Sequence, residues 1–470
     1  MGSNRFDIII IGAGACGLGI ASFMNRRGFA VLLIDKSPSH IGGDSLNNGC
    51  ASSKSLLHIA SRIRAGRDAS VFGYSLEGSA DMGKIIEAIS SQANALRAHK
   101  DISSLQKEGI TVVLGEASFA NAKSVVVGGI RYVGKKIVIA TGSRPRPLEV
   151  DGISDARVFT HENIFSITFL PKRLLVVGAG PTGIELGQAF SALGSHVSIV
   201  DVEDRILPRE DREISEILLS RLKKQGISFY LKRNIESIRG GRQMIVSKEN
   251  QVEEAIAFDA LLVAIGGVPN IENLKLEDAG IRVEKNTIVV DAYLRTSNKR
   301  VLVCGDALEG PQFTHDVQEH EKIILHNLFS FFKKKYRKGI YARVTHGDPE
   351  VATFGVSEDE LKRRKVPFKT YRYRFENDEC AIIGSYQYGL LKVQCTPRGR
   401  ILGGSMIAPY AGELIQELIY IMTHGHTLNT LLKKIYPYSS MTRVNRSLAL
   451  NQEAEKLTPF AKKMFRLFFH

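Results

Sequence analysis

The chain contains 470 residues, of which 44% are hydrophobic and 24% are charged, and this composition excludes a largely disordered or collagen-like protein. At about 150 residues per domain, the length predicts roughly three domains. Lys and Arg exceed Asp and Glu by 63 to 49, which gives a formal net charge of +14. This excess is compatible with nucleic acid, membrane surfaces or anionic ligands and selects none of them.

The number and spacing of the cysteines bear on metal binding and on the cellular compartment of the protein. The five cysteines include no Cys-x-x-Cys pair, so we expect no metal site. Their odd number and wide spacing argue against a secreted disulfide scaffold and favour the cytoplasm.

The first predicted elements lie in an uncharged run over residues 8–25, preceded by Arg5. Such a run is compatible with a signal peptide or a membrane span. Four glycines interrupt it. The pattern therefore favours a buried strand over Ile8–Ile11 followed by a helix over Leu18–Arg26.

The same pattern occurs twice in the chain. Residues 8–35 read IIIIGAGACGLGIASFMNRRGFAVLLID, and residues 174–201 read LLVVGAGPTGIELGQAFSALGSHVSIVD. Each copy runs from an apolar strand through a glycine turn and a helix to a second strand that ends in an acid. The matching positions are Gly12, Gly14, Gly17 and Asp35 in the first copy and Gly178, Gly180, Gly183 and Asp201 in the second.

A repeated strand, glycine turn and helix with these spacings is typical of dinucleotide binding. The first glycine forms the tight turn, the second lets the backbone approach a pyrophosphate, and the third lets the helix pack on the strand. The N-terminus of the helix then faces the phosphates, and the terminal acid can accept a hydrogen bond from a ribose hydroxyl. We therefore predict an α/β protein with two Rossmann-like domains that bind two different dinucleotides.

Three later strands also end in turns that can approach a ligand. Lys136–Ala140 leads into Thr141-Gly142, Ala260–Ala264 leads into Gly266-Gly267, and Val301–Cys304 leads into Gly305-Asp306. From residue 351 onward, strand-like stretches precede a predicted long helix over Ala411–His424. This part is predicted to be a third, α+β domain.

The order of these motifs resembles the class I pyridine nucleotide-disulfide oxidoreductases, the family of lipoamide dehydrogenase, glutathione reductase and mercuric reductase. GAGACG, GGDSLNNGCASSK at 42–54, ATG at 140–142, GAGPTG, CGDA at 304–307, FTH at 313–315 and the segments 344–356 and 401–415 follow in family order. The resemblance implies an FAD domain over 1–148 and 271–343, an NAD(P) domain over 149–270, and a dimerisation domain over 344–470 that builds a homodimer.

The resemblance also assigns residues to each cofactor. For FAD it implies Gly12, Gly14, Gly17, Asp35, Gly43, Lys54, Thr141, Gly142 and Asp306. For the pyridine nucleotide it implies Gly178, Gly180, Gly183, Asp201 and Gly266. Asp201 favours NAD, because a carboxylate repels the 2′-phosphate of NADP, although nearby His196, Arg205 and Arg209 leave NADP as an alternative.

The redox segment departs from the family pattern. Cys50 matches the cysteine that lies against the flavin, but Ser45 occupies the position of the second, substrate-attacking cysteine. Cys50 and Lys54 share one face of a helix, and a thiol at a helix N-terminus beside a lysine has a lowered pKa. Glu185 matches a family acid that pairs with this lysine near the nicotinamide.

The C-terminal acid–base motif departs as well. The family's histidine falls on Tyr438, and Arg443 replaces its glutamate; His424 and His426 lie nearby without the correct spacing. Tyrosine has an unperturbed pKa near about 10 and is a poor base at neutral pH. The expected catalytic residues are therefore Cys50, Lys54, Glu185 and Tyr438.

Three functions are compatible with these residues. The first is an NADH-dependent flavoprotein that passes electrons directly to a small acceptor such as a quinone, metal ion or dye. The second is a mercuric reductase- or dihydrolipoamide dehydrogenase-type thiol oxidoreductase in which Ser45 replaces a redox cysteine. The third is a flavoprotein redox sensor without catalysis.

Basic segments complete the sequence. The runs 333–338 and 362–365 resemble solvated faces, and no nucleic-acid module surrounds them. Residues 458–470 predict a basic amphipathic helix with Phe460, Met464, Leu467 and Phe468 on one face. Docking on its own dimer is the favoured use of this tail, and weak contact with an anionic membrane surface is the alternative.

Overall fold

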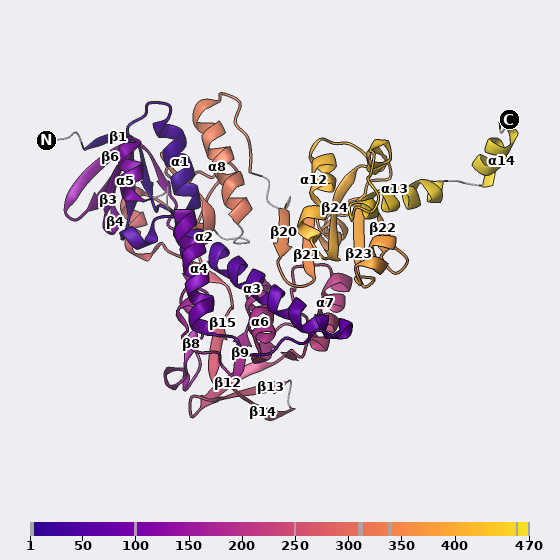
Figure 1. Ribbon diagram of the computed structural model, residues 1–470. Coiled ribbons are helices and arrows are strands. Elements are labelled where there is room, and N and C mark those ends of the chain that lie inside the picture. The colour runs from indigo at the N-terminus through magenta and orange to yellow at the C-terminus, as the bar shows by residue number, and fades with distance from the viewer. Residues whose placement is uncertain are drawn as a thin grey trace.

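The computed structural model describes residues 4–97, 101–248, 251–308, 314–336, 341–456 and 459–468. Three sheets organise three bodies, and the first and third lie on either side above the second (Figure 1). In the described residues no helix has both the length and the apolar character needed to cross a membrane.

The first body is built on a seven-stranded sheet in the order β3-β2-β1-β6-β5-β4, with β19 also paired to β6. Its strands are β1 (Arg5–Ile11), β2 (Val31–Asp35), β3 (Thr111–Leu114), β4 (Ala117–Asn121), β5 (Ser124–Val127), β6 (Ile130–Ile139) and β19 (Val301–Val303). The pairs that β1, β2, β3, β6 and β19 form among themselves are parallel, so the carboxyl ends of these five strands meet at one edge. Ile8–Ile11 are buried on both faces, as expected for a central parallel strand.

Helices cover this sheet and connect it to the second body. They are α1 (Ala15–Asn25), α2 (Gly43–Asn47), α3 (Cys50–Asp68), α4 (Met82–Arg97), α5 (Ile102–Lys107) and α8 (Thr314–Phe329). The helix expected over Leu18–Arg26 begins three residues earlier, at Ala15, directly after the glycine turn. α3 packs against α4 and against α6 of the second body (Figure 1).

The second body contains a parallel sheet in the order β11-β10-β9-β15-β8. Its strands are β8 (Val158–Phe159), β9 (Arg173–Val177), β10 (His196–Asp201), β11 (Ser228–Leu231) and β15 (Ala260–Val263), and its helices are α6 (Pro181–Leu193) and α7 (Arg212–Lys224). An antiparallel sheet of β12 (Asn234–Arg239), β13 (Gln243–Lys248) and β14 (Gln251–Ala257) is added. Where the chain enters and leaves this body, β7 (Ser143–Pro145) pairs with β16 (Gly267–Pro269).

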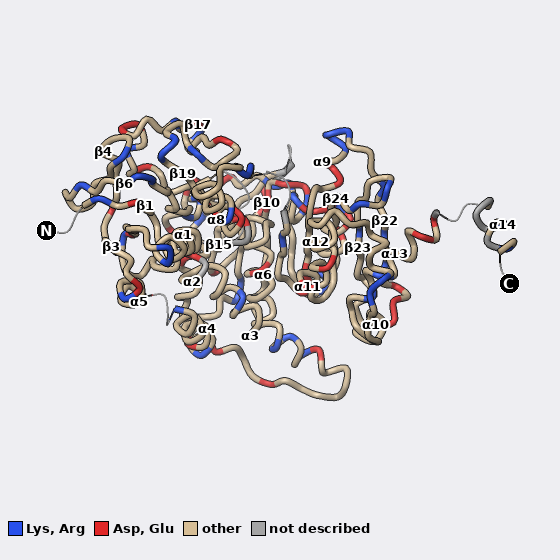
Figure 2. Tube along the Cα trace, turned by 90° about the horizontal axis from the view of Figure 1, so that it is seen from above, with Lys and Arg blue, Asp and Glu red and all other residues tan. Residues whose placement is uncertain are grey.

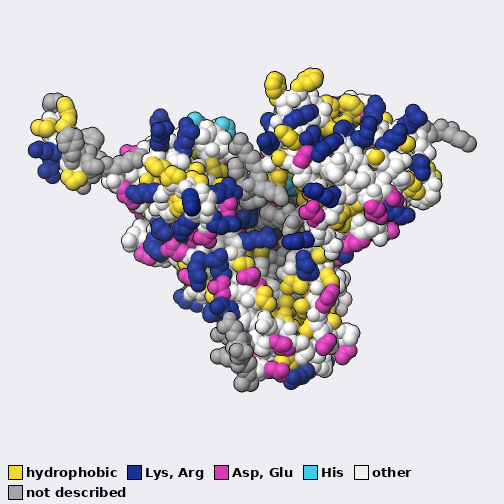
Figure 3. All heavy atoms as spheres, turned by 180° about the vertical axis from the view of Figure 1, so that it is seen from behind, with side chains coloured by type: hydrophobic (Ala, Val, Ile, Leu, Met, Phe, Trp, Pro, Cys, Tyr) yellow, Lys and Arg dark blue, Asp and Glu magenta, His cyan; other side chains and the backbone are white. Residues whose placement is uncertain are grey.

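The third body is an antiparallel sheet in the order β20-β21-β24-β23-β22. Its strands are β20 (Tyr341–Thr345), β21 (Glu350–Gly355), β22 (Lys369–Arg374), β23 (Leu390–Cys395) and β24 (Ile401–Ala408). Its helices are α9 (Glu358–Arg363), α10 (Glu379–Ile383), α11 (Ala411–Leu414), α12 (Gln416–Thr423) and α13 (Arg443–Lys456). α14 (Pro459–Leu467) lies beyond it, away from the sheet (Figures 1 and 3).

The prediction of a single helix over Ala411–His424 is wrong. The chain forms two helices there, α11 and α12, which meet at Ile415. Side chains take carbonyl groups that a continuous helix would use itself. The Gln416 amide donates to the Gly412 carbonyl at 2.9 Å, and the buried Asn445 amide donates to the Leu414 carbonyl at 2.8 Å.

A buried ion-pair cluster fixes the third body on the second. Lys392 of β23 is 5% exposed, and its Nζ lies 2.6 Å from Asp211 and 3.4 Å from Glu213 of the second body. Arg343 also contacts Glu210, with an Nε to Oε1 distance of 2.9 Å. Buried charges of this kind must remain paired, so the two bodies are held in one relative position.

Lys and Arg are distributed over all three bodies (Figure 2). In the run 362–365, Lys362 pairs with Glu358 at 2.9 Å, and Arg363 and Arg364 contact Glu360. This arrangement is that of a solvated helix face. The last two residues of the run 333–338, like Phe313 and Thr458, lie outside the described residues.

Candidate active site

The first glycine turn has the geometry of a dinucleotide-binding turn. Gly12 adopts φ of 105°, and a Cβ there would lie 2.2 Å from the Ala140 carbonyl oxygen. A Cβ on Gly17 would lie 1.9 Å from the Gly12 oxygen, so a glycine is required at this position for α1 to pack on the turn. At Gly14 a Cβ would have only the Gly43 Cα within 4 Å, at 3.9 Å, which leaves this position open.

The second glycine turn repeats the first. Gly178 adopts φ of 109°, and its Cβ would lie 2.4 Å from the Ala264 oxygen. A Cβ on Gly183 would lie 1.9 Å from the Gly178 oxygen, whereas a Cβ on Gly180 would meet no atom within 4 Å. α6 begins at Pro181, directly after the open glycine. Both turns thus present an open glycine and a helix N-terminus to a ligand.

The acids that end the second strands have a further role that the sequence did not reveal. Asp35 Oδ2 accepts a hydrogen bond from the Ala13 N–H at 2.6 Å, and Asp201 Oδ2 accepts one from the Ala179 N–H at 2.6 Å. Each acid therefore braces the glycine turn of its own copy. The matched placement of these acids is the signal from which the role could have been inferred.

A cavity of about 370 Å³ lies at the carboxyl edge of the first sheet. Residues that were expected to bind FAD line it, namely Gly12, Gly14, Asp35, Gly43, Thr141, Gly142 and Asp306. Gly17 and Lys54 do not line it, and neither does Gly266, which adopts φ of 89° in the turn after β15. Burial and the neighbouring Asp44 raise the pKa of Asp306 to about 6.

The cavity fits a bound dinucleotide in two respects. Thr141 Oγ1 is buried and has no hydrogen-bond partner in the described structure, so it has capacity to bind a polar ligand. The bare Cα of Gly14 leaves space at the N-terminus of α1, where free N–H groups attract phosphate.

The redox segment lies next to this cavity. Cys50 is exposed and is the first residue of α3, and Lys54 follows one helical turn later. Lys54 Nζ lies 2.7 Å from Glu185 Oε2 on α6. Ser45 falls within α2, but its side chain lies outside the described atoms.

Glu185 connects all three bodies. Its side chain is 7% exposed, and while Oε2 pairs with Lys54, Oε1 accepts the N–H of His346 in the third body at 2.7 Å. Gln188, one turn further along α6, adds two hydrogen bonds to Asp348. The expected pairing of Lys54 with Glu185 is present, and the contact with His346 was not anticipated.

Tyr438 does not line the cavity. It lies in the third body with 70% of its surface exposed, and the Arg443 guanidinium lies 5.0 Å from its ring centroid. His424 and His426 follow α12, with ring centroids 6.3 Å apart. Within this single chain, Tyr438 is therefore not brought together with Cys50, Lys54 and Glu185.

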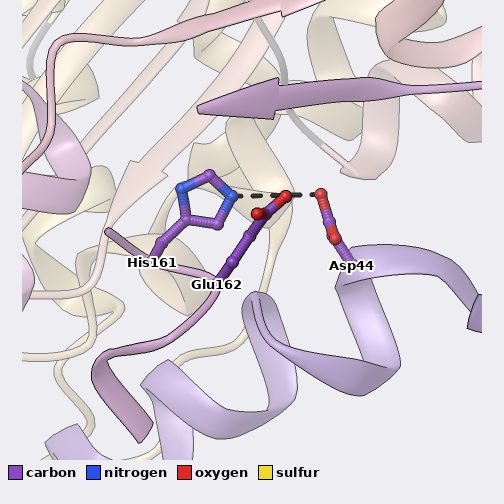
Figure 4. A group of neighbouring side chains, drawn as sticks. All are labelled: Asp44, His161 and Glu162. Carbon is purple, nitrogen blue, oxygen red and sulfur yellow. Dashed lines mark ion pairs between the residues drawn. The ribbon is translucent and has the colours of Figure 1, made fainter. Parts of the chain in front are cut away.

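A further cluster was missed entirely. Asp44 of α2 faces His161 and Glu162 of the segment after β8, and one ligand atom from each lies within 4.8 Å of the others (Figure 4). His161 Nε2 lies 3.9 Å from Asp44 Oδ2. Burial raises the pKa of Glu162, and the Asp44 carboxylate raises it further. No metal site was expected from the sequence, and these three residues place possible metal ligands close together.

Comparisons with known proteins agree with this geometry. The family profile described as pyridine nucleotide-disulphide oxidoreductase matches residues 6–320, and that of the family's dimerisation domain matches residues 341–447. The chain belongs to the pyridine nucleotide-disulphide oxidoreductase family. It is therefore an FAD-dependent enzyme that uses a pyridine nucleotide, with two nucleotide-binding domains and a dimerisation domain.

Relatives of known identity cover nearly the whole chain. A mercuric reductase of Lysinibacillus sphaericus is 29% identical over 95% of this chain and 82% of its own length. A dihydrolipoyl dehydrogenase of Mycoplasma pneumoniae is 30% identical over 94% of this chain and 97% of its own. The solved HOCl-induced flavoprotein disulfide reductase RclA of Escherichia coli is 27% identical, with a TM-score of 0.83, over 94% of this chain and 99% of its own.

Proposed function

We propose that the protein transfers hydride from NADH to FAD and passes the electrons from reduced FAD directly to a small acceptor, either an oxidised metal ion or a quinone. The observation that carries this proposal is the redox segment, in which Cys50 is the only cysteine between residues 42 and 54. Cys16 and Cys304 are buried in the wall of the cavity, Cys395 is buried, and Cys380 is half-buried in the third body. Exchange between two thiols of the redox segment therefore lacks its second thiol.

The two glycine turns divide the cofactors between them. The first turn, with Thr141 and Asp306, binds FAD. When bound, FAD would accept a hydride and pass its electrons on to the acceptor. The second turn binds NADH through Gly178, Gly180, Gly183 and Gly266. The Asp201 carboxylate disfavours a 2′-phosphate, while Arg205 and Arg209 nearby keep NADPH as the alternative. The domains extend over 1–148 with 271–343, 149–270 and 344–470.

The Lys54–Glu185 pair orients the site between the first two bodies. Because Glu185 is nearly buried and bound on both oxygens, it holds the ammonium of Lys54, which lies one helical turn after Cys50 on α3. A thiolate is a preferred ligand for soft metal ions, so Cys50 holds such an acceptor while electrons arrive.

Tyr438 acts across the homodimer built by the third body. Its exposure of 70% within one chain supports a role at a surface that a second copy covers. There its hydroxyl donates a hydrogen bond to the acceptor. We place the enzyme in the cytoplasm, because a free thiol such as that of Cys50 stays reduced there.

The tail helix α14 contributes to the same dimer. Met464, Leu467 and Phe468 are 37%, 69% and 69% exposed, and a second copy of the chain offers an apolar surface on which they dock. Weak contact with an anionic membrane is the alternative, since Lys463 and Arg466 lie on the same short helix.

Anaerobic titration with NADH tests the proposal. We expect the absorbance of bound FAD to bleach with one equivalent of NADH and to return on addition of a quinone or Cu²⁺. Small disulfides are expected to reoxidise it poorly. Rapid reoxidation by lipoamide or glutathione disulfide contradicts direct transfer, and absence of bleaching by either NADH or NADPH favours the non-catalytic sensor.

The second candidate is a mercuric reductase- or dihydrolipoamide dehydrogenase-type enzyme in which Ser45 stands in place of a redox cysteine. The full-length similarity to a mercuric reductase supports it. Ser45→Cys separates the two candidates. If this substitution restores disulfide or Hg²⁺ reduction by several orders of magnitude, as the gain of a covalent nucleophile does, the two-thiol mechanism is correct.

A further inference from the structure

We propose that Asp44, His161 and Glu162 form a binding site for one divalent cation, of the Mn²⁺ or Zn²⁺ kind, on the wall of the FAD cavity. The three residues come from two segments that face each other, α2 on one side and the segment after β8 on the other (Figure 4). Their side chains point toward a common centre, and one ligand atom from each lies within 4.8 Å of the others. This inference requires only that FAD occupies the cavity and does not depend on the identity of the electron acceptor.

The ligand set selects the class of cation. Two carboxylates and one imidazole provide two oxygen atoms and one nitrogen atom. Mg²⁺ and Ca²⁺ prefer oxygen alone, and Cu⁺ prefers thiolate or thioether, whereas Mn²⁺ and Zn²⁺ accept mixed nitrogen and oxygen ligands. Three protein ligands leave at least one coordination position open for water or another oxygen ligand.

The position of the cluster provides independent support. Asp44 and Glu162 line the same cavity as Gly12, Gly14 and Asp306. Asp44 directly follows Gly43, where a Cβ would lie 2.8 Å from the Gly14 Cα, so its backbone is next to the open glycine of the first turn. This is the point at which a dinucleotide pyrophosphate binds.

Carboxylates outnumber cationic side chains on the wall of this cavity. Five line it, those of Asp35, Asp44, Glu116, Glu162 and Asp306, where the pyrophosphate adds two further negative charges. The Lys36 ammonium on the wall is paired with Glu116, with Nζ 3.3 Å from Oε1, and the Arg144 guanidinium is paired with Glu272, with Nη2 2.6 Å from Oε1. Like charges in a partly buried site repel strongly, and a divalent cation between the carboxylates and the pyrophosphate removes this repulsion.

Titration of Mn²⁺ into the purified flavoprotein, after dialysis against EDTA, tests the site. Electron paramagnetic resonance of free Mn²⁺ is expected to show one bound ion per chain. Asp44→Asn, His161→Asn and Glu162→Gln are each expected to weaken binding by about tenfold or more. Two matched controls are expected to bind as the wild type does: His58→Asn, on the exposed face of α3, and Glu116→Gln, on another part of the cavity wall.

Two further measurements on the wild-type protein keep the test decisive if a variant fails to fold. Spin-echo spectroscopy of bound Mn²⁺ is expected to show coupling to a histidine nitrogen. Removal of the cation by EDTA is expected to accelerate FAD release, and added Mn²⁺ or Zn²⁺ to reverse this effect. The proposal is overturned if the wild type binds neither ion, if the bound ion shows no nitrogen coupling, or if His161→Asn binds as tightly as the wild type. None of these measurements uses NADH, so failure here is distinct from failure of the redox proposal.

Discussion

Lys54 and Glu185 lie 131 positions apart in the sequence, yet their charged atoms are 2.7 Å apart. Lys54 belongs to the helix that begins at Cys50, and Glu185 belongs to the helix that begins at the second glycine turn. One ion pair therefore links the thiol, the flavin-binding body and the pyridine nucleotide-binding body. We therefore expect stability and electron transfer to depend on the same two side chains.

Lys54→Met is expected to destabilise the protein more than Glu185→Gln. Loss of the lysine leaves the Glu185 carboxylate, 7% exposed, without its counter-charge, at a cost of about 1 to 3 kcal/mol because Lys54 itself is half-exposed. Glutamine keeps hydrogen-bonding capacity and costs less. Denaturant unfolding measures both. Lys362→Met removes an exposed ion pair and serves as the control, expected to cost less than about 1 kcal/mol; equal effects of Lys54→Met and Lys362→Met contradict the assignment.

Substitutions in the glycine turns are expected to separate folding from cofactor binding. Gly14→Val fills the open position and is expected to yield folded protein without yellow FAD. Gly17→Ala places a Cβ 1.9 Å from the Gly12 oxygen and is expected to prevent folding. Gly180→Val, the matched substitution in the second copy, is expected to remain yellow but not to be bleached by NADH. Visible absorbance measures the bound FAD, and circular dichroism measures folding. A Gly14→Val protein that retains its full content of FAD contradicts the assignment of the FAD site.

Asp201→Asn is expected to narrow the preference for NADH over NADPH by about tenfold, a difference of about 1.4 kcal/mol. Asparagine keeps an acceptor for the Ala179 N–H and removes the charge that repels a 2′-phosphate. Asp35→Asn, the matched change in the first copy, is expected to leave the preference unaltered. Flavin bleaching rates with each coenzyme provide the measurement. A wild-type protein that uses NADPH better than NADH contradicts the role of Asp201.

Cys50→Ser is expected to affect the reduction of metal ions and the reduction of dyes differently. The rate of quinone or dye reduction should remain within about threefold of the wild-type rate. Such a change corresponds to less than about 1 kcal/mol in the activation free energy, as expected if Cys50 does not contact these acceptors in the rate-limiting step. Reduction of a thiophilic metal ion should fall by at least tenfold, and any long-wavelength thiolate-to-flavin absorption should disappear. Cys380→Ser, in the third body, is the control. Robust disulfide reduction that requires Cys50 while Ser45 is present contradicts direct transfer.

We expect the buried carboxyl group of Asp316 to make the protein less stable as the pH rises. It is 7% exposed on α8, and burial raises its pKa to about 6 from an ordinary 3.8. The folded state therefore holds this proton more tightly, so stability falls as pH rises from about 4 through 6 and stays lower above that range. Asp316→Asn is expected to raise the unfolding temperature by about 2 to 4 °C at pH 8 and to change it little at pH 4. Glu319→Gln on the same helix is the control, and an equal shift at both pH values contradicts the explanation.

Local patterns in the sequence were sufficient to predict both glycine turns and the strands and helices beside them. The glycine turns at Gly12 and Gly178 are encoded by spacing within a few residues, and their repetition identifies the fold. The pairing of Lys54 with Glu185 required the family resemblance. The Asp44, His161 and Glu162 cluster could not be predicted, because α2 and the segment after β8 meet only in the folded chain. Where Ala411–His424 divides into two helices, the Leu414 carbonyl accepts a hydrogen bond from Asn445, which is distant in sequence.

The return of β19 to the first sheet has a consequence for biosynthesis. Residues 158–263 form the complete second sheet, whereas the first sheet receives Val301–Val303 only afterwards. Chains emerge from the ribosome at about 5 to 20 residues per second, and domains fold as units as they emerge. The inserted domain is thus fully synthesised several seconds before the strand that precedes Asp306. With FAD at the first sheet, as proposed, its capture must come late in synthesis, after the second body has had time to fold.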